Sequence, residues 1–182
     1  LGNTGIELPI VSIGVMRADS PGLVHAAVKS GIRHFDTAHG YQNGSNETML
    51  GAALKEYPRD SFVIATKIET VSSRERFGEK LDLSLKRLQM SFVDILYLHS
   101  VSSRGDVLNQ EMLAALQAAK ASGKARHIGV STHKNEHEVI QAAIESGVIE
   151  VVLSSVNFKQ SNRTELREVI AKAAAEGIGI IA

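Results

Sequence analysis

Short apolar segments and amphipathic segments alternate along the whole chain, and this alternation constrains the fold more than any other feature. Segments rich in branched apolar residues predict strands at 9–15, 32–36, 62–67, 92–98, 126–130, 149–153 and 178–182. Apolar residues at helical spacing predict helices at 20–30, 45–56, 74–90, 109–122, 134–146 and 162–176. Successive strand centres are about 28 residues apart, which is the length of one strand–helix unit.

Two α/β architectures share this alternation: the open, doubly wound sheet and the barrel of parallel strands. An open dinucleotide-binding sheet normally has a G-x-G-x-x-G loop after its first strand, and the corresponding segment here is GVMRADSPG. We therefore expect the α/β class with a parallel (β/α)8 TIM barrel. This chain would supply about six strand–helix units and the start of the seventh strand.

The length of the chain bears on its domain organisation. A complete barrel of this type usually has about 250 residues, whereas this chain has 182. We expect residues 1–182 to form a single barrel domain without its C-terminal strands and loops, within a longer polypeptide, because natural sheets avoid open edges. The alternative is a short protein that pairs its open edges by oligomerising.

Polar side chains follow three successive predicted strands, at the point where each strand ends. They are Asp36 and Tyr41 in FDTAHGY, Lys67 in VIATK and His99 in ILYLH. The carboxyl ends of barrel strands converge on one face, so we expect these four side chains to lie together. A carboxylate, a phenol, an ammonium and an imidazole at one place suit the transfer of a proton to a carbonyl oxygen.

The chemistry assigns each of the four a role. Tyr41 is the candidate general acid, and the charge of Lys67 makes loss of the phenol proton easier. Asp36 is expected to hold Lys67 in place and keep it charged. His99 is expected to orient the carbonyl oxygen and to stabilise the charge that develops on it. The alternative is that the four are buried polar residues that only satisfy one another.

The same segments resemble the aldo-keto reductase family. GIRHFDTAHGYQNGSNETMLGAAL is similar to the second strand, loop and helix of that family, and LGNTGIELPIVSIG is similar to its N-terminal hairpin and first strand. VIATK, SLKRLQMSFVDILYLH and GKARHIGVST continue in the family's order. The resemblance implies an NAD(P)H-dependent oxidoreductase that reduces small-molecule aldehydes and ketones. It also assigns the family's catalytic tetrad to Asp36, Tyr41, Lys67 and His99.

The resemblance further implies where a cofactor would bind. NADPH is the expected cofactor, with NADH left open, because the family grips the phosphates with loops after strands seven and eight. The expected contacts to the nicotinamide half of the cofactor are Gly14, Met16, Asp36, Ser131 and Thr132. Ser131 and Thr132 could equally form a turn or cap the next helix.

The chain departs from the family pattern around the sixth strand. Leu153 and Val156 stand where relatives often have Gln and Tyr, and Asn157 is the nearest polar substitute. One side-chain contact to the nicotinamide carboxamide is therefore in question.

Four further histidines are candidate site residues. His34 has the same strand parity as Asp36, and we interpret it as a core histidine with satisfied hydrogen bonds. His39 is interpreted as a residue of the surface loop more than as a substrate contact. His133 and His137 have the spacing of a metal pair, but no third ligand is apparent, so no metal site is predicted.

Composition excludes several function classes. Lys plus Arg and Asp plus Glu are each 20, so the formal net charge is zero and no nucleic-acid partner is expected. Cysteine is absent, which excludes disulfides and thiolate metal sites within these residues. No apolar run approaches the roughly 18 residues of a membrane span. We expect a cytoplasmic protein with no membrane association.

Two functions of other classes remain open. One is a non-catalytic or slow redox-sensing regulatory subunit on the same fold. The other is an aldolase- or isomerase-type barrel in which Lys67 forms a Schiff base, although a lysine beside a carboxylate stays charged and is a poor nucleophile.

Overall fold

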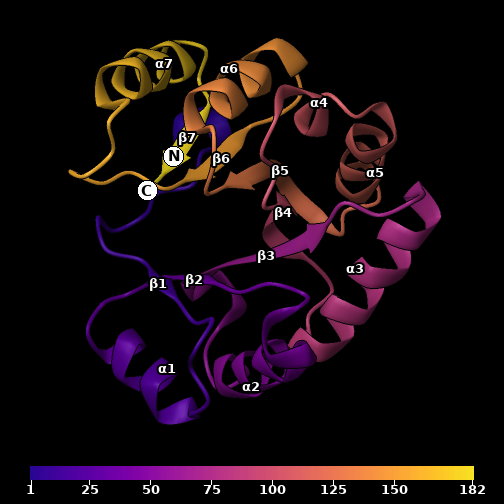
Figure 1. Cartoon of the computed structure of the whole chain (residues 1–182). Coiled ribbons are helices and arrows are strands. Elements are labelled where there is room, and N and C mark those ends of the chain that lie inside the picture. Colours follow the sequence, from indigo (N-terminus) through magenta and orange to yellow (C-terminus); the bar gives the residue numbers. More distant parts are fainter.

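A computed structural model describes all 182 residues, and its centre is one curled sheet of seven parallel strands (Figure 1). The strands pair in chain order: β1 (Ile13–Gly14), β2 (His34–Asp36), β3 (Val63–Glu69), β4 (Val93–His99), β5 (Ala125–Thr132), β6 (Val151–Ser154) and β7 (Gly179–Ile181). The expected fold class is confirmed, because seven parallel strands with alternating helices form most of a (β/α)8 barrel.

The chain has seven α-helices, and they lie around the outside of the sheet (Figure 1). They are α1 (Pro21–Lys29), α2 (Ser45–Leu54), α3 (Arg74–Leu88), α4 (Arg104–Val107), α5 (Gln110–Ala121), α6 (Glu136–Ser146) and α7 (Arg163–Ala175). Three short 3-10 helices complete the structure: η1 (Gly2–Thr4), η2 (Tyr41–Gly44) and η3 (Arg59–Ser61). None of the helices is long and apolar enough to cross a membrane.

Helix α3 illustrates how the sequence specifies these elements. Ser73 caps its first turn by accepting a hydrogen bond from the Arg76 N–H, and Gln89 ends it in the left-handed conformation. Its buried residues recur at helical spacing and face the sheet: Phe77, Leu81, Ser84, Leu85 and Leu88. Ser20 and Asn109 cap the first turns of α1 and α5 in the same way, whereas α2, α6 and α7 have no side-chain cap.

Alternate residues of each strand face either the helices or the barrel interior. The larger apolar core lies between the sheet and the helices, and a smaller inner cluster contains Ala65, Ile95, Tyr97 and Val151. Gly129 leaves room for this cluster, because a Cβ there would lie 2.8 Å from the Tyr97 ring and 2.3 Å from the Val151 carbonyl oxygen. The inward positions of β2, β3 and β4 also include Asp36, Lys67 and His99, in register with the cluster.

The N-terminal segment differs from the expected hairpin. Residues 1–12 form no strand, and only η1 is regular there. The Asn3 N–H instead donates to the Gly177 carbonyl oxygen at 2.7 Å, and Leu1 and Ile6 pack against the inner cluster. A Cβ at Gly179 would lie 2.6 Å from Leu1, so glycine permits this contact. Close packing against β7 therefore replaces strand pairing. The short helix α4, capped by Ser103, was also not expected.

Candidate active site

Three consecutive strands and one turn bring the predicted tetrad together at the carboxyl end of the sheet. Asp36 ends β2, Lys67 lies near the end of β3, and His99 ends β4. Tyr41 is the first residue of η2, in the turn that connects β2 to α2. Because the three strands are neighbours in the sheet and parallel, their inward side chains converge at the carboxyl-end opening of the sheet, which we call the mouth.

Lys67 is the centre of the arrangement. It is 2% exposed, and its ammonium donates to Asp36 Oδ1, to the Thr37 carbonyl oxygen at 2.7 Å and to the Tyr41 hydroxyl at 3.4 Å. These three acceptors use the three N–H groups of the ammonium. The side chain is therefore held in one position, with its charge directed at the phenol oxygen.

His99 completes the group by packing against Tyr41. The two rings pack edge to face, with centroids 5.7 Å apart. Burial, and secondarily the charge of Lys67, lower the pKa of His99 from 6.5 to about 4. The imidazole is therefore neutral at neutral pH. It has one N–H to donate and is not itself a source of protons.

Two polar residues lie in the barrel interior behind the tetrad. His34 is 1% exposed and neither of its ring nitrogens has a hydrogen-bond partner in the protein, so the expectation of a satisfied core histidine is wrong. Burial is the largest cause of its lowered pKa. The Tyr97 hydroxyl is buried without a partner as well, and burial, followed by repulsion from Asp36, raises its pKa.

The residues predicted to contact a cofactor surround the same mouth. Gly14 pairs with Asp36 in the sheet, and Met16 follows it with 47% of its surface exposed. Ser131 is buried, and its hydroxyl oxygen accepts a hydrogen bond from the Ser100 N–H at 2.9 Å. Its own hydroxyl hydrogen remains available to another acceptor. Asp36 Oδ2 also has no partner.

Thr132 behaves differently from Ser131. Its hydroxyl donates to the Lys134 carbonyl oxygen at 2.6 Å and accepts from the Lys134 N–H at 3.2 Å. The hydroxyl thus forms a turn, which is the alternative to a cofactor contact, and it both donates to and accepts from the backbone.

The two apolar residues that depart from the family pattern around the sixth strand have different surroundings. Leu153 packs against the inner cluster, and Val156 is 46% exposed. Asn157 accepts from the Lys159 N–H at 3.0 Å, within its own loop. The Asn157 amide oxygen therefore stabilises its own loop.

The other three histidines that were candidates for the site contact groups outside the tetrad. His39 Nδ1 lies 2.9 Å from the Ser84 hydroxyl, so the ring is directed at α3. His133 lies 3.0 Å from the Ser155 hydroxyl, and His137 lies 3.3 Å from the Asn162 amide. The two histidines with metal-pair spacing therefore have different polar neighbours.

A buried polar group that the sequence analysis does not identify lies behind the turn that carries Tyr41. Asn46 and Glu47, at the start of α2, have no exposed surface. The Asn46 amide donates to the Val15 carbonyl oxygen at 2.6 Å and accepts from the Thr37 hydroxyl at 2.6 Å. A signal was available, because Glu47 has the helical spacing of the buried residues Leu50, Gly51 and Leu54. A charged residue on an apolar helix face needs a buried partner.

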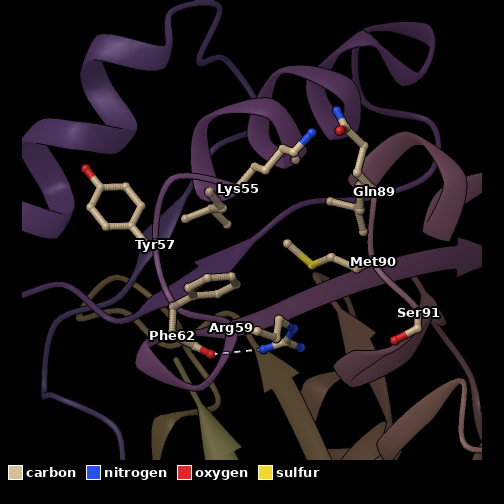
Figure 2. Close-up of a pocket in the computed structure, with 10 residues that line it drawn as sticks. Lys55, Tyr57, Arg59, Phe62, Gln89, Met90 and Ser91 are labelled. Carbon is tan, nitrogen blue, oxygen red and sulfur yellow. Dashed lines mark hydrogen bonds between the residues drawn. The ribbon is translucent and has the colours of Figure 1, made fainter.

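A separate hollow of about 250 Å³ lies at the opposite end of the sheet, where the amino ends of β3 and β4 meet the end of α2. Figure 2 shows Phe62 and Met90 pointing into it, with Arg59 along one side and Lys55 and Gln89 at the rim. It contains none of the tetrad, so the mouth at the carboxyl ends is the better candidate for chemistry.

Comparison with known proteins is consistent with this geometry. The model of the Aldo/keto reductase family matches residues 12–182. L-galactose dehydrogenase of Arabidopsis thaliana is 31% identical over 200 residues, an alignment that covers the whole of this chain and 62% of the plant protein. The chain therefore spans about three fifths of the length of this curated relative.

Solved structures have the same fold. A thermostable aldo-keto reductase in complex with the inhibitor epalrestat is 26% identical, with a TM-score of 0.83, and the match covers all of this chain and 70% of that one. An aldo-keto reductase from Klebsiella pneumoniae in complex with NADPH has a TM-score of 0.81 at 22% identity, covering 96% of this chain and 63% of that one.

Proposed function

The chain belongs to the aldo/keto reductase family, and we propose that it reduces aldehyde and ketone carbonyl groups with a reduced nicotinamide dinucleotide, NADPH or NADH. The observation that supports this most strongly is the position of the Lys67 ammonium, which donates both to Asp36 and to the Tyr41 hydroxyl. This arrangement suits a phenol that must give up its proton at neutral pH.

The mouth of the barrel fits the nicotinamide end of such a cofactor. The free hydroxyl hydrogen of Ser131 suits the oxygen of a carboxamide, and the unpaired Asp36 Oδ2 suits a polar N–H or O–H group. Gly14 and Met16 would form the exposed wall beside them. When bound, the cofactor would supply the hydride.

The proton would come from the protein. Tyr41 gives its hydroxyl proton to the carbonyl oxygen as negative charge develops there, and Lys67 stabilises the phenolate that remains. Asp36 and the Thr37 carbonyl oxygen hold the ammonium so that it does not have to reorganise during the reaction.

His99 would orient the substrate. A neutral imidazole has one N–H donor, and edge-to-face packing places its ring beside the Tyr41 phenol. A carbonyl oxygen between the two rings would accept hydrogen bonds from His99 and Tyr41 together. The oxygen is thereby held for protonation.

A labelled-hydride experiment tests this function. The protein is incubated with a panel of aldehydes and ketones and with NADPH or NADH carrying deuterium at the transferable position. The proposal predicts an alcohol with one deuterium on the former carbonyl carbon, formed equally well by Tyr57→Phe, whose hydroxyl contacts His25 and not the tetrad. No reduction of any carbonyl compound with either cofactor, or an unlabelled alcohol, would refute it.

A further inference from the structure

A second polar cluster lies on the outer face of β3, directly behind Lys67. Strand residues alternate between the two faces, so Lys67 points into the barrel while Thr66 points toward the helices. The Thr66 hydroxyl donates to Glu47 Oε1 at 2.7 Å, and both residues have no exposed surface. The buried carboxylate of Glu47 is therefore attached to the residue next to the catalytic lysine.

Arg87 connects this carboxylate to the turn that carries Tyr41. Its Nη1 donates to Glu47 Oε2 at 3.2 Å and to the His39 carbonyl oxygen at 3.0 Å. His39 lies two residues before Tyr41, and its own N–H donates to the Lys67 carbonyl oxygen at 2.9 Å. One guanidinium thus joins α3, α2 and the turn between β2 and α2.

The turn itself needs such support. Gln42 and Asn43 have φ values of 49° and 54°, and Gly44 has a φ of 89°. Consecutive left-handed residues that are not glycine are strained, and strain of this kind persists only where the surroundings enforce it. Arg87 lies directly against the turn, because a Cβ on Gly44 would be 2.1 Å from its Cζ.

The energetics suggest a role other than stability alone. The Glu47 side chain is fully buried and that of Arg87 is 21% exposed. An ion pair this far removed from water adds little to stability, because the loss of hydration offsets most of the attraction between the charges. Such a pair does define geometry, because each charge accepts few alternative positions without a large penalty. Here the pair joins β3, through Thr66, to the turn between β2 and α2, through the His39 carbonyl oxygen. The relative position of this strand and this turn sets the 3.4 Å separation of the Lys67 ammonium and the Tyr41 hydroxyl.

We propose that Glu47 and Arg87 are positioning residues that hold the Tyr41 turn in register with Lys67 from the outer face of the sheet. This inference rests on the proposed function for its consequence, since Tyr41 and Lys67 are the acid and its neighbouring charge there. Neither positioning residue lies among the four catalytic groups, and both act through the segments that they join.

Three variants and one control test the proposal: Glu47→Gln, Arg87→Met, the double variant that combines them, and Asp94→Asn. The control removes a different buried carboxylate, which binds Arg59 and Arg126 at the amino end of the sheet. Two readouts need no cofactor or substrate: hydrogen exchange of the His39 and Tyr41 amides, and the NMR signals of the Tyr41 ring. Tyr57 and Tyr97, the other two tyrosines of the chain, serve as internal references.

We expect each single variant to speed exchange of the two amides by about tenfold to a hundredfold and to shift the Tyr41 signals, while Tyr57 does not move. The double variant should recover much of the stability toward denaturant, because no unpaired buried charge remains, but it should keep the loosened turn. Asp94→Asn should lower stability and leave the turn unchanged. An unchanged turn in both single variants, or a turn restored in the double variant, would overturn the proposal.

Activity then separates this inference from the proposed function. In protein that reduces carbonyl compounds, the single variants should lower kcat by roughly tenfold to a hundredfold with little change in KM, because the acid is misplaced while the binding surface remains. Equal loss of kcat in the Asp94→Asn control would show an effect of stability alone and would overturn the positioning role. If the unmodified protein reduces no carbonyl compound, the proposed function fails, whereas exchange and NMR still decide whether the pair holds the turn.

Discussion

The Lys67 ammonium lies 3.4 Å from the Tyr41 hydroxyl, although the two residues are 26 positions apart in the sequence. Lys67 is delivered by a buried strand and Tyr41 by a strained turn, and they meet only because β2 and β3 are parallel neighbours. The other two donors of the ammonium bind Asp36 and the Thr37 carbonyl oxygen. The position of the charge therefore depends on both segments.

Removing this charge should abolish most of the activity. In Lys67→Met the phenol loses the neighbouring ammonium that stabilises its phenolate, so carbonyl reduction should fall by about 10²–10⁴-fold. Lys124→Met, which removes the lysine of an exposed ion pair with Asp82, is the control and should retain activity. Steady-state rates at saturating cofactor and substrate measure both, and a nearly normal rate for Lys67→Met would contradict the role of the charge.

The titration of His99 gives an independent measure of the electrostatics. Burial, followed by the charge of Lys67, lowers the pKa of His99 to about 4 from 6.5. NMR titration of the ring protons should therefore find a midpoint near 4 for this histidine. In Lys67→Met the midpoint should rise but stay below 6.5, because burial is the larger cause. A midpoint at 6.5 in the unmodified protein would contradict the described environment.

The same shift predicts how stability depends on pH. Between pH 6.5 and about 4 the unfolded chain binds a proton at His99 that the folded chain does not, so the free energy of unfolding should fall as pH falls through this window. Burial lowers the pKa values of His34 and His39 as well, so they act in the same direction. Urea unfolding across the window measures the slope. Its flattening in His99→Gln is expected, and an unchanged slope would exclude His99 as a contributor.

Asp94 should be the carboxylate with the largest effect on stability at the amino end of the sheet. Its oxygens accept from Arg59 at 2.7 Å, from the Ile64 N–H at 2.9 Å and from Arg126 at 3.0 Å, and its side chain is 3% exposed. Asp94→Asn should lower the free energy of unfolding by about 1–3 kcal/mol. The exposed Asp82→Asn should stay within about 0.5 kcal/mol. Denaturant titration compares them, and equal effects would contradict the account.

Gly129 should tolerate no side chain. A Cβ there would meet the Val151 carbonyl oxygen and the Tyr97 ring within the inner cluster. Gly129→Ala should cost about 1–3 kcal/mol through overpacking. Gly78→Ala is a matched control in the interior of α3, where a Cβ would meet nothing within 4 Å. It should stabilise by about 0.5–1 kcal/mol, since alanine is the better helix former. Thermal unfolding measures both changes, and a neutral Gly129→Ala would contradict the packing.

Sequence patterns predicted the elements that depend on local signals. Strand β3 and helix α3 were expected within a few residues of their bounds. A buried apolar run and a capped, amphipathic segment are both recognisable from the local sequence alone. The expectation of an N-terminal hairpin was wrong, because the packing of Leu1 against Gly179 involves residues that are far apart in the sequence. A contact between such distant residues leaves no periodic pattern of apolar residues in the sequence.

Some residues of the candidate site are predictable from local signals, and others become apparent only from tertiary packing. Placing Asp36 and Lys67 at strand ends was enough to expect them at one mouth, and the structure brings them together there. The contacts of Glu47 and Arg87 were not expected, because their partners come from different elements and become apparent only when the helices are packed. The interior position of His34 was expected, but its lack of partners was not.

The rate of the chemical step in Tyr41→Phe tests the central claim most directly. The substitution removes the phenol oxygen and its proton while keeping the ring that packs against His99. At saturating cofactor and carbonyl compound, with hydride transfer shown to be rate-limiting by a deuterium isotope effect, we predict a fall of about 10²–10⁴-fold with cofactor binding retained. A Tyr41→Phe protein that reduces the same carbonyl compound at close to the unmodified rate would contradict the assignment of Tyr41 as the general acid.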